Sequence, residues 1–465
     1  MKKLLFLFTL TIHAFDPAPY YRKKHYDSTT VTLHPGKLVH VNRFDVMAKY
    51  LYARHRAWGV HDAWALEVYR EHLAVWNNFI ERVPAPHLPI AQCAQQYIQK
   101  TGFKEFLDSF NALLDTVEKE GFNTQKSVIP VDENFVLMDG GHRTAAGLLY
   151  NIPLTCRRFF KVKADVASAD YFRHRTNFVK TGLRTEYLDA MALEYFRLKE
   201  PLYLMILFPQ AMHRIAEVKS ILGKYGAIAY TKKIELTERG AFNLLHECYR
   251  GEPWIGTIES NFGGLHSKKN QCFPQGKGTI LVILFEAAHV DIVKRAKKEV
   301  RSLFNIGNSS VHSVDTHAAS FEFAQTVCNS NGVHWINHAY IRAFERFEKY
   351  VHDFKQNLQQ HAIDPELLCI DGSAVLSAYG FRDCADLDLI HQCDIAQLTS
   401  AVVQSHHSEL PYHGLEKEYI IFNPAYHFYL RGIKFVSLMQ LATMKKQRGE
   451  PKDLLDLVLI EKGLE

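Results

Sequence analysis

One segment in the last quarter of the chain constrains its local fold more than any other. Gly372 and Ser373 stand at a turn before a helix-compatible run, and Asp386 and Asp388 lie two residues apart in a later apolar run. Side chains two residues apart on a β-strand project from the same face, so the two carboxylates would lie side by side and could share a hard divalent cation. The Ser373 hydroxyl and the amides at the helix start would receive a triphosphate. The segment therefore predicts a site for magnesium-dependent phosphate chemistry.

The same segment resembles the nucleotidyltransferase superfamily when it is taken together with Arg382 and the basic stretch at 431–453. In that family a Gly-Ser turn and an Asp-x-Asp strand assemble the metal and triphosphate site, and a later helix carries a Lys-Asp pair. The resemblance implies that Asp386 and Asp388 are catalytic and bind Mg²⁺. It implies triphosphate contacts for Gly372, Ser373, Arg382, Lys452 and Asp453.

The chain departs from this family at one point. Many members have a third carboxylate on a later strand, and the corresponding run at 419–423 has none, because Glu416 and Glu418 only flank it. Two interpretations remain open at this stage: either two carboxylates suffice, or catalysis is impaired.

A glycine-rich turn near residue 140 predicts a second phosphate site. Gly140 and Gly141 would let the backbone approach an anion closely at the start of a helix, and Arg143 would supply a fork of donors. The order helix, strand, strand, turn and helix over 110–149 resembles the ParB/sulfiredoxin-like fold. The phosphate-gripping positions of that fold are matched by Asp139, Gly140, His142 and Arg143. Since members include DNA-partitioning nucleoside triphosphatases, a sulfinic acid reductase and free-serine kinases, the resemblance implies phosphate handling and no single reaction. The alternative is a tight turn with a surface arginine.

The middle third predicts an α+β, ferredoxin-like pattern, with expected strands at 203–209, 228–235 and 279–286 and an expected helix at 215–226. This order and the segment at 301–316 resemble nucleoside diphosphate kinase, whose Asn-x-x-x-His-Gly-Ser-Asp motif contains a histidine that is phosphorylated during turnover. The resemblance implies a phosphate carrier at His312, a nucleotide contact at Asn308, a loop position at Asp315 and a phosphate clamp at Arg301. A neutral imidazole is a competent nucleophile near pH 7.

This segment also departs from its family. Ser313 and Val314 replace a Gly and a Ser, and Phe208 occupies the place of the usual strand-end Lys. Glu322 lies one residue short of the glutamate that supports the histidine. The segment before Arg301 is too short for the usual nucleotide-gripping loop. Retained nucleotide binding is therefore favoured over active phosphotransfer.

The length and composition predict several cores. With 465 residues and 47% hydrophobic content, the chain should form two to four domains in a multidomain α+β fold. The predicted divisions are a candidate signal peptide at 1–14, a helical and ParB/sulfiredoxin-like domain at 25–200, a nucleoside diphosphate kinase-like domain at 201–340 and a nucleotidyltransferase-like domain at 350–465.

Signals for localisation point in two directions. Residues 1–14 have the basic start, short apolar stretch and small residue of a secretory signal peptide, and the alternative is a first buried strand. Eight cysteines without a Cys-x-x-Cys pair indicate reduced thiols, which together with nucleotide chemistry favour the cytoplasm. No stretch is long and apolar enough to be transmembrane. His406, His407 and His413 lack the helical spacing of a metal site and are interpreted as loop histidines.

These features predict Mg²⁺-dependent phosphoryl or nucleotidyl transfer from a nucleoside triphosphate, ATP or CTP, to a small acceptor such as a sugar or sugar phosphate. The rival hypothesis is a nucleotide-sensing or interaction protein that keeps the folds without the chemistry. A ParB-like DNA binder is least favoured, because the net charge of +5 is mild and no helix-turn-helix is evident. The oligomeric state is not indicated.

Overall fold

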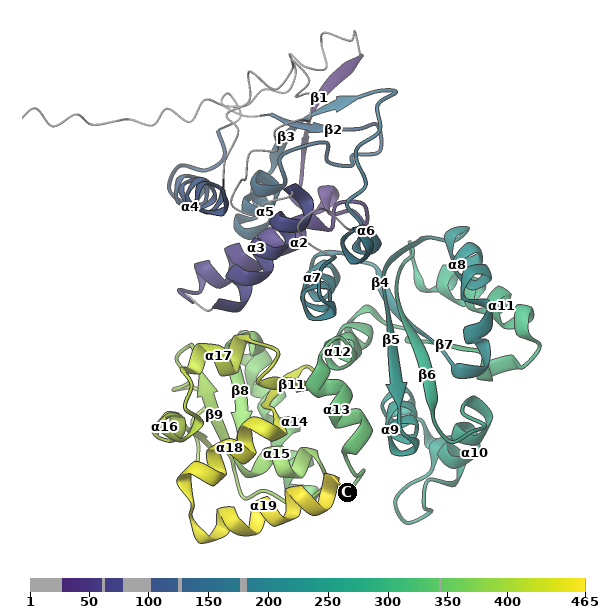
Figure 1. Ribbon diagram of the computed structural model, residues 1–465, viewed down its shortest axis with the longest axis vertical. Helices are drawn as coiled ribbons and strands as arrows, with labels where there is room; N and C mark the ends of the chain where they lie inside the picture. The colour runs from purple at the N-terminus through teal and green to yellow at the C-terminus, as the bar shows by residue number, and fades with distance from the viewer. Residues whose placement is uncertain are drawn as a thin grey trace, which may run out of the picture. The chain divides into compact units, whose positions relative to one another are not determined.

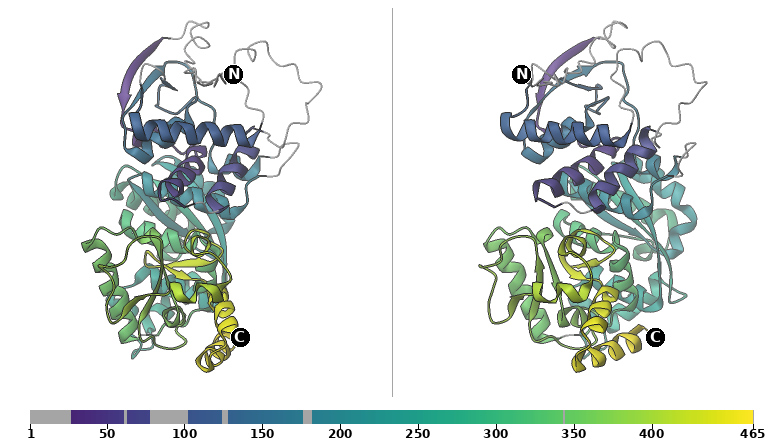
Figure 2. Two further views of the ribbon diagram at one scale, coloured as in Figure 1. Left: turned by 90° about the vertical axis from the view of Figure 1, so that its left-hand side faces the viewer. Right: turned by 60° about the vertical axis from the view of Figure 1, so that its left-hand side comes forward.

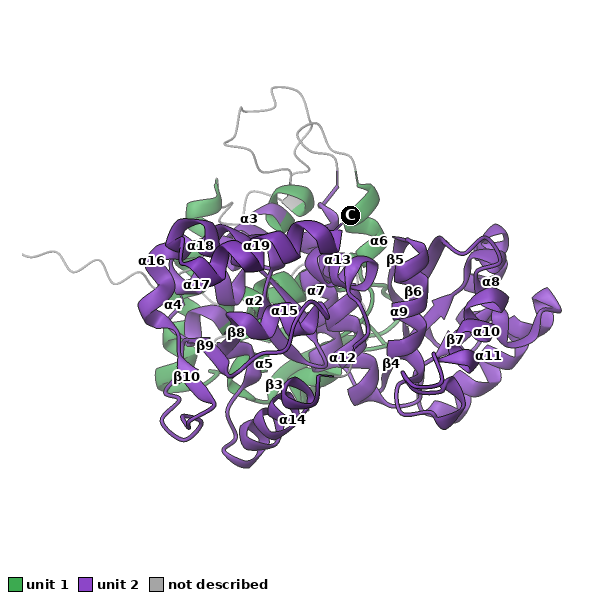
Figure 3. Cartoon of the chain, turned by 90° about the horizontal axis from the view of Figure 1, so that it is seen from below, with its two compact units in different colours: residues 1–54, 72–181 green, residues 55–71, 182–465 purple. Residues whose placement is uncertain are grey.

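Three open sheets with helices around them make this chain an α+β protein, as a computed structural model shows (Figure 1). The structure describes residues 27–60, 63–77, 102–123, 128–175, 182–342 and 344–464. The candidate signal peptide at 1–14 lies outside these residues. The chain divides into two compact units, residues 1–54 with 72–181 and residues 55–71 with 182–465 (Figure 3).

The first unit contains a three-stranded sheet in the order β1-β3-β2. β3 pairs antiparallel with β1 and parallel with β2. α4 buries Phe110, Leu114 and Val117, which recur at the spacing of one helical face, and it packs against α5. The elements over residues 27–175 are β1 (Ser28–Leu33), α2 (Asp45–Ala57), α3 (Ala63–Asn77), α4 (Phe103–Glu120), β2 (Ile129–Val131), α5 (Gly141–Tyr150), β3 (Leu154–Phe159) and α6 (Ala169–His174), and the end of α2 and the start of α3 belong to the second unit.

One strand expected in this unit is nearly absent. The run after 134 was expected to form a strand before the glycine-rich turn, and it contributes only an isolated bridge between Val131 and Leu137. Phe135 has a positive φ of 63°, which no extended strand accommodates, so the chain turns there instead of continuing. The helix expected after the glycine-rich turn is present as α5.

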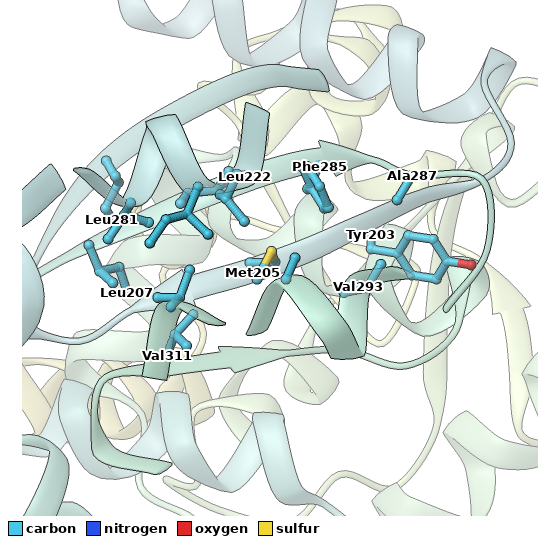
Figure 4. Packing of buried hydrophobic residues seen from close by; sticks show 14 of the residues in the cluster. Tyr203, Met205, Leu207, Leu222, Leu281, Phe285, Ala287, Val293 and Val311 are labelled. Carbon is cyan, nitrogen blue, oxygen red and sulfur yellow. The ribbon is translucent and has the colours of Figure 1, made fainter. Parts of the chain in front are cut away.

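The middle sheet, in the second unit, has the order β5-β6-β4-β7 with antiparallel neighbours throughout. Its strands are β4 (Leu202–Leu207), β5 (Ala227–Leu236), β6 (Gly278–Glu286) and β7 (Val311–Ser313). The three strands and the helix expected from apolar runs are confirmed, and the short β7 was not expected. Every residue of β4 is buried, since α8 (Ile215–Gly223) and α11 (Val290–Phe304) cover one face and α12 packs on the strand as well (Figure 4).

The C-terminal sheet has the order β10-β9-β8-β12-β11. β9 is antiparallel to β8 and parallel to β10, so the end of β8 lies at the same edge of the sheet as the starts of β9 and β10, with Asp388 paired to Asp371 on one side and to Gln404 on the other. Its strands are β8 (Leu368–Asp371), β9 (Leu387–His391), β10 (Val403–Ser405), β11 (His427–Leu430) and β12 (Ile433–Val436). Its helices are α14 (Glu345–Gln360), α15 (Ser373–Ala378), α16 (Leu410–His413), α17 (Lys417–Phe422), α18 (Leu438–Arg448) and α19 (Pro451–Leu464), the last two lying side by side (Figure 2).

The run at 419–423 was expected to correspond to a later strand, and this expectation is wrong. Most of it belongs to the helix α17, which buries Ile420, Ile421 and Phe422. A short apolar run is equally compatible with a buried helix. The negative charge of Glu418 in the first turn also interacts favourably with the positive end of the helix dipole.

Two helices join the middle and C-terminal sheets within the second unit. α12 (His317–Val327) contacts both β4 and β11, and α13 (Ser330–His338) contacts β5 and β11. The Thr326 hydroxyl donates to the carbonyl of Tyr429 at 3.0 Å, and the amide of Asn329 donates to that of His427 at 3.1 Å. The remaining helices of the unit are α7 (Thr185–Leu198), α9 (Glu238–Tyr249) and α10 (Gly263–Cys272). Among the described residues, no helix combines the length and apolar character needed to cross a membrane.

Candidate functional site

A cavity of about 720 Å³ lies at one end of the middle sheet, between α9, α10, α11 and β7. Four residues that the sequence assigns to one nucleotide site all line it. They are Arg301 from α11, Asn308 from the turn before β7, His312 from β7 and Asp315 just after it. The fold thus brings the four residues around one space of the size that small-molecule ligands occupy.

His312 owes its position to the alternation of a β-strand. Val311 and Ser313 are buried, while His312 is half-buried and lines the cavity. Its ring meets the ring of Tyr249 edge-on, with the centroids 4.7 Å apart. Burial, assisted by the charges of nearby lysine and arginine residues, lowers the pKa of His312 to about 3. The imidazole is therefore neutral at physiological pH.

Three cations and two carboxylates line the same cavity. The cations are Lys268, Lys297 and Arg301, and the carboxylates are Glu252 and Asp315. The Lys268 ammonium donates to the carbonyl of Asn308 at 3.0 Å, and the Arg301 guanidinium donates to that of Val311 at 3.2 Å. Neither partner is charged, so these contacts leave both positive charges available to an anion.

An aromatic wall completes the cavity. Tyr249 and Trp254 line it with their ring centroids 4.9 Å apart, and the Trp254 residue is 44% exposed. Neither these rings nor Lys268 and Lys297 were identified from the sequence. They stand 15 to 63 residues before His312 and reach it only through the packing of α9, α10 and α11.

Two departures noted in the sequence have structural counterparts. Phe208, directly after β4, is fully buried with its ring 5.7 Å from that of Phe273, so a hydrophobic contact stands at the position where the resembled family has a lysine. The Glu322 carboxylate pairs with the Lys355 ammonium and lies against Gly432. Glu322 is therefore engaged with the C-terminal part of the unit.

In the C-terminal sheet, the Gly372 backbone supports the Asp388 carboxylate. A β-carbon at Gly372 would lie 2.2 Å from Asp388 Oδ2, and the Gly372 φ is +65°. Both facts require glycine at this position. Ser373 follows at the start of α15 and is half-buried, and Asp386 directly precedes the strand β9 that carries Asp388. The predicted turn, helix and Asp-x-Asp strand are thus assembled in one place.

A buried carboxylate with two histidines lies beside Asp388. This arrangement was not predicted from the sequence. Asp371 is fully buried at the end of β8, and its Oδ2 accepts hydrogen bonds from His406 Nδ1 and His413 Nε2, both at 2.8 Å. His406 Nε2 lies 3.8 Å from Asp388 Oδ2. His406 does lie in the loop that follows β10, whereas His413 belongs to the helix α16, so the interpretation as a loop histidine is wrong for His413.

Negative charge gathers around Asp388. Its pKa is raised by burial and by the charges of Asp386 and Asp371, against the opposing effect of His406. A divalent cation would relieve this repulsion. Mg²⁺ is usually held by one or two carboxylates, with phosphate oxygens and waters filling the other positions, so Asp386 and Asp388 fit it. Within the described ranges no three His, Cys, Asp or Glu side chains form a complete metal site by themselves.

The three remaining residues assigned to the triphosphate have other partners. The Arg382 guanidinium makes a bidentate pair with Asp456, at 2.6 and 2.8 Å. The Lys452 side chain is 65% exposed and pairs with Glu450 at 3.0 Å. Asp453 is fully buried.

Asp453 holds two cations in the interior between α18 and α19. Its carboxylate pairs with Lys445 at 3.1 Å and with Arg448 at 2.7 Å. Removing it in Asp453→Ala should destabilise the fold by about 3 kcal/mol, because buried cations lose their partner. Urea denaturation of this variant beside Lys452→Ala, which should change stability by less than about 0.5 kcal/mol, measures the difference. Equal stability of the two variants would contradict the structural role.

The glycine-rich turn of the first unit lies over a buried ion network. Asp45 pairs with Arg43 at 2.8 Å and with Lys49 at 2.5 Å, and a β-carbon at Gly141 would lie 3.0 Å from both Asp45 Oδ2 and Lys49 Nζ. Gly140 caps α5 with a φ of +90°. Two cations and one carboxylate thus lie beneath the start of this helix.

The two side chains that follow this turn have partners of their own. His142 packs edge-on against Phe110, with ring centroids 4.8 Å apart. Arg143 donates to the carbonyl of Val128 at 3.3 Å and lies 3.6 Å from the Asp139 carboxylate. Arg143 therefore contacts Asp139, which carries the opposite charge.

No protein-family model, curated protein or solved structure matches this chain.

Proposed function

We propose that this protein transfers phosphoryl or nucleotidyl groups from a nucleoside triphosphate to a small acceptor, with the His312 cavity as its nucleotide site. The observation that carries this proposal is the convergence of Arg301, Asn308, His312 and Asp315 on one cavity. These residues were selected from a sequence pattern alone. Lys268 adds positive charge to the same space, and Lys297, which lies 3.8 Å from the Asp315 carboxylate, offsets the charge of that residue, which suits a polyphosphate.

The arrangement of the middle sheet supports a nucleoside diphosphate kinase-like domain. Its elements follow the order strand, helix, strand, strand, helix and strand once the helices α9 and α10 between β5 and β6 are set aside, and the antiparallel order β5-β6-β4-β7 is that of a ferredoxin-like sheet. β7, at the edge of this sheet, carries His312 next to β4.

The reaction at His312 can be written with these residues. A neutral imidazole nitrogen attacks the γ-phosphorus, the bond from that phosphorus to the bridging oxygen breaks, and the nucleoside diphosphate leaves. An acceptor oxygen then attacks the phosphorus and releases the imidazole. Arg301, Lys268 and Lys297 stabilise charge on the phosphoryl oxygens in both steps. Tyr249 and Trp254 offer surfaces on which a base can stack.

The C-terminal sheet supports a nucleotidyltransferase-like domain. Asp386 and Asp388 would hold Mg²⁺, which neutralises charge on a triphosphate when bound. Gly372 leaves room for the Asp388 carboxylate, and Ser373 starts a helix next to it. His406 Nε2 lies 3.8 Å from Asp388 Oδ2, and the His406 ring is itself oriented by its hydrogen bond to Asp371.

Labelled nucleotides test the proposal directly. The full-length protein should acquire an acid-labile, base-stable label from γ-labelled ATP or CTP with Mg²⁺, and an unlabelled nucleoside diphosphate should remove that label. A label from α-labelled nucleotide on an added sugar or sugar phosphate would assign nucleotidyl transfer to the C-terminal site. Absence of both nucleotide binding and labelling would refute the proposal.

A nucleotide-sensing protein is the second candidate. The observation in its favour is the position of Glu322, which pairs with Lys355 instead of supporting the His312 imidazole. Without a carboxylate to fix its tautomer, the imidazole would bind phosphate without accepting it. Tight nucleotide binding with no label and no product would identify a sensor.

A further inference from the structure

A second cavity, of about 700 Å³, lies on another side of α9 and α10. α13 and Leu464 at the end of α19 close it, and it shares no lining residue with the His312 cavity. α9 contributes its first half to this space and its last residues to the other. The second unit therefore has two separate cavities of ligand size.

Asn243 lines this cavity and carries an acceptor atom left unpaired within the described part of the chain. The residue is 1% exposed, and its Nδ2 donates to the carbonyls of Ile336 at 2.8 Å and Ala339 at 2.7 Å. Because an amide oxygen cannot donate to two carbonyls, these bonds fix the orientation of the side chain. Its Oδ1 is buried without a hydrogen-bond partner among the described residues, although Asn243 lines the cavity. Native proteins rarely leave such an atom unpaired, so a donor group on a ligand would supply the missing hydrogen bond.

Aromatic rings form one wall of the same space. Phe242 lies with its ring centroid 4.8 Å from that of His266 and 5.8 Å from that of Phe262. All three residues line the cavity, and the first two come from neighbouring helices. A planar ring can stack or pack edge-on against such a wall.

A cation stands near the other wall. The Arg239 guanidinium lies 3.8 Å from the centre of the Tyr340 ring and donates to the carbonyl of His338 at 3.1 Å. Both partners are uncharged. Lys269 also lines the cavity, but its ammonium is paired with Glu238 at 2.6 Å. Arg239 is therefore the charge that an anionic group on the ligand would meet.

We propose that this cavity binds a mononucleotide whose base carries an exocyclic amino group. The base packs against Phe242, Phe262 and His266, its amino group donates to Asn243 Oδ1, and its phosphate meets Arg239. The site is separate from His312 and takes no part in phosphoryl transfer. It is an effector site in the same unit.

Calorimetric titration with matched ligands tests this assignment. The full-length His312→Asn, Lys268→Ala variant, in which the first cavity is weakened, should bind AMP about tenfold more tightly than purine riboside 5′-monophosphate, which lacks only the amino group. It should also bind AMP more tightly than adenosine, which lacks the phosphate. Equal affinity for AMP and purine riboside monophosphate would overturn the proposal.

Two further substitutions in that background locate the site. Asn243→Leu should abolish the preference for AMP over purine riboside monophosphate. His266→Ala removes an exposed ring and leaves the backbone contacts of Asn243 intact, so it should weaken both ligands by about fivefold to tenfold even if Asn243→Leu fails to fold. Unchanged AMP affinity in His266→Ala would place the ligand elsewhere. Phosphate labelling at His312 in the otherwise wild-type protein is a separate readout, so failure of either proposal leaves the other standing.

Discussion

His312→Asn is expected to lower phosphoprotein formation by at least about a thousandfold, while nucleotide affinity changes by less than about threefold. Asparagine preserves much of the volume and polarity of the side chain and removes the nucleophilic nitrogen. The cations that attract the polyphosphate, Lys268 and Arg301, are untouched. The two measurements are acid-labile label from γ-labelled nucleotide and nucleotide affinity by calorimetry.

His289→Asn is the matched control for this substitution. The His289 side chain is 57% exposed just before α11 and does not line the cavity, so its replacement should leave labelling and affinity unchanged. Label that persists in His312→Asn would assign the carrier to another residue. Loss of affinity together with label would indicate that His312 shapes the cavity.

The sequence was most informative where one local pattern determines one structure. The apolar runs of β4 and β6 were recognised as strands because buried strands are short and continuous in their hydrophobicity. The motif around His312 assigned four residues to one site, and the fold brings these four residues to one cavity. The run at 419–423 was misassigned because three consecutive apolar residues carry no period that separates a strand from a helix.

Contacts between distant segments could not be predicted in this way. Asp371, His406 and His413 come together because β10 runs parallel to β9 and α16 follows it, and no spacing in the sequence encodes that pairing. Asp453 was assigned to a triphosphate through its neighbour Lys452, yet it faces inward while Lys452 faces outward. Adjacent residues on a helix point in different directions, so a dipeptide motif says little about which side chain reaches a ligand.

The histidines around Asp371 also bear on the absent third carboxylate. His406 is hydrogen-bonded to a buried carboxylate, and this interaction, with the charges of Asp388 and Glu409, raises its pKa against the effect of burial. A protonated His406 would neutralise part of the charge of Asp388, whereas a third carboxylate would add to it. The C-terminal site is therefore less negative than one with three carboxylates, which favours binding of an anionic nucleotide while reducing the attraction for a metal ion.

Gly372→Ala is expected to destabilise the protein by about 3 kcal/mol, because its φ of +65° and ψ of −145° are almost restricted to glycine and because the new methyl group would overlap Asp388. The matched control is Gly449→Ala, which has a similar φ of +69° and no atom within 4 Å of the added carbon, so it should cost only about 1 kcal/mol. The excess combines the overlap with the carboxylate and the greater backbone strain at Gly372, because the ψ of Gly449 is 22°. Urea denaturation at constant pH gives both values.

A double-mutant cycle with Asp388→Ala separates the overlap from the backbone strain. The truncated side chain no longer reaches the new methyl group, so Asp388→Ala should recover about 1–2 kcal/mol of the loss in Gly372→Ala and none of the loss in Gly449→Ala. Additive effects of Asp388→Ala with Gly372→Ala and with Gly449→Ala would mean that the Asp388 side chain does not contact Gly372. If the coupling is found, the glycine is required by the position of the carboxylate, and the Gly-Ser turn and the Asp-x-Asp strand are two halves of one site.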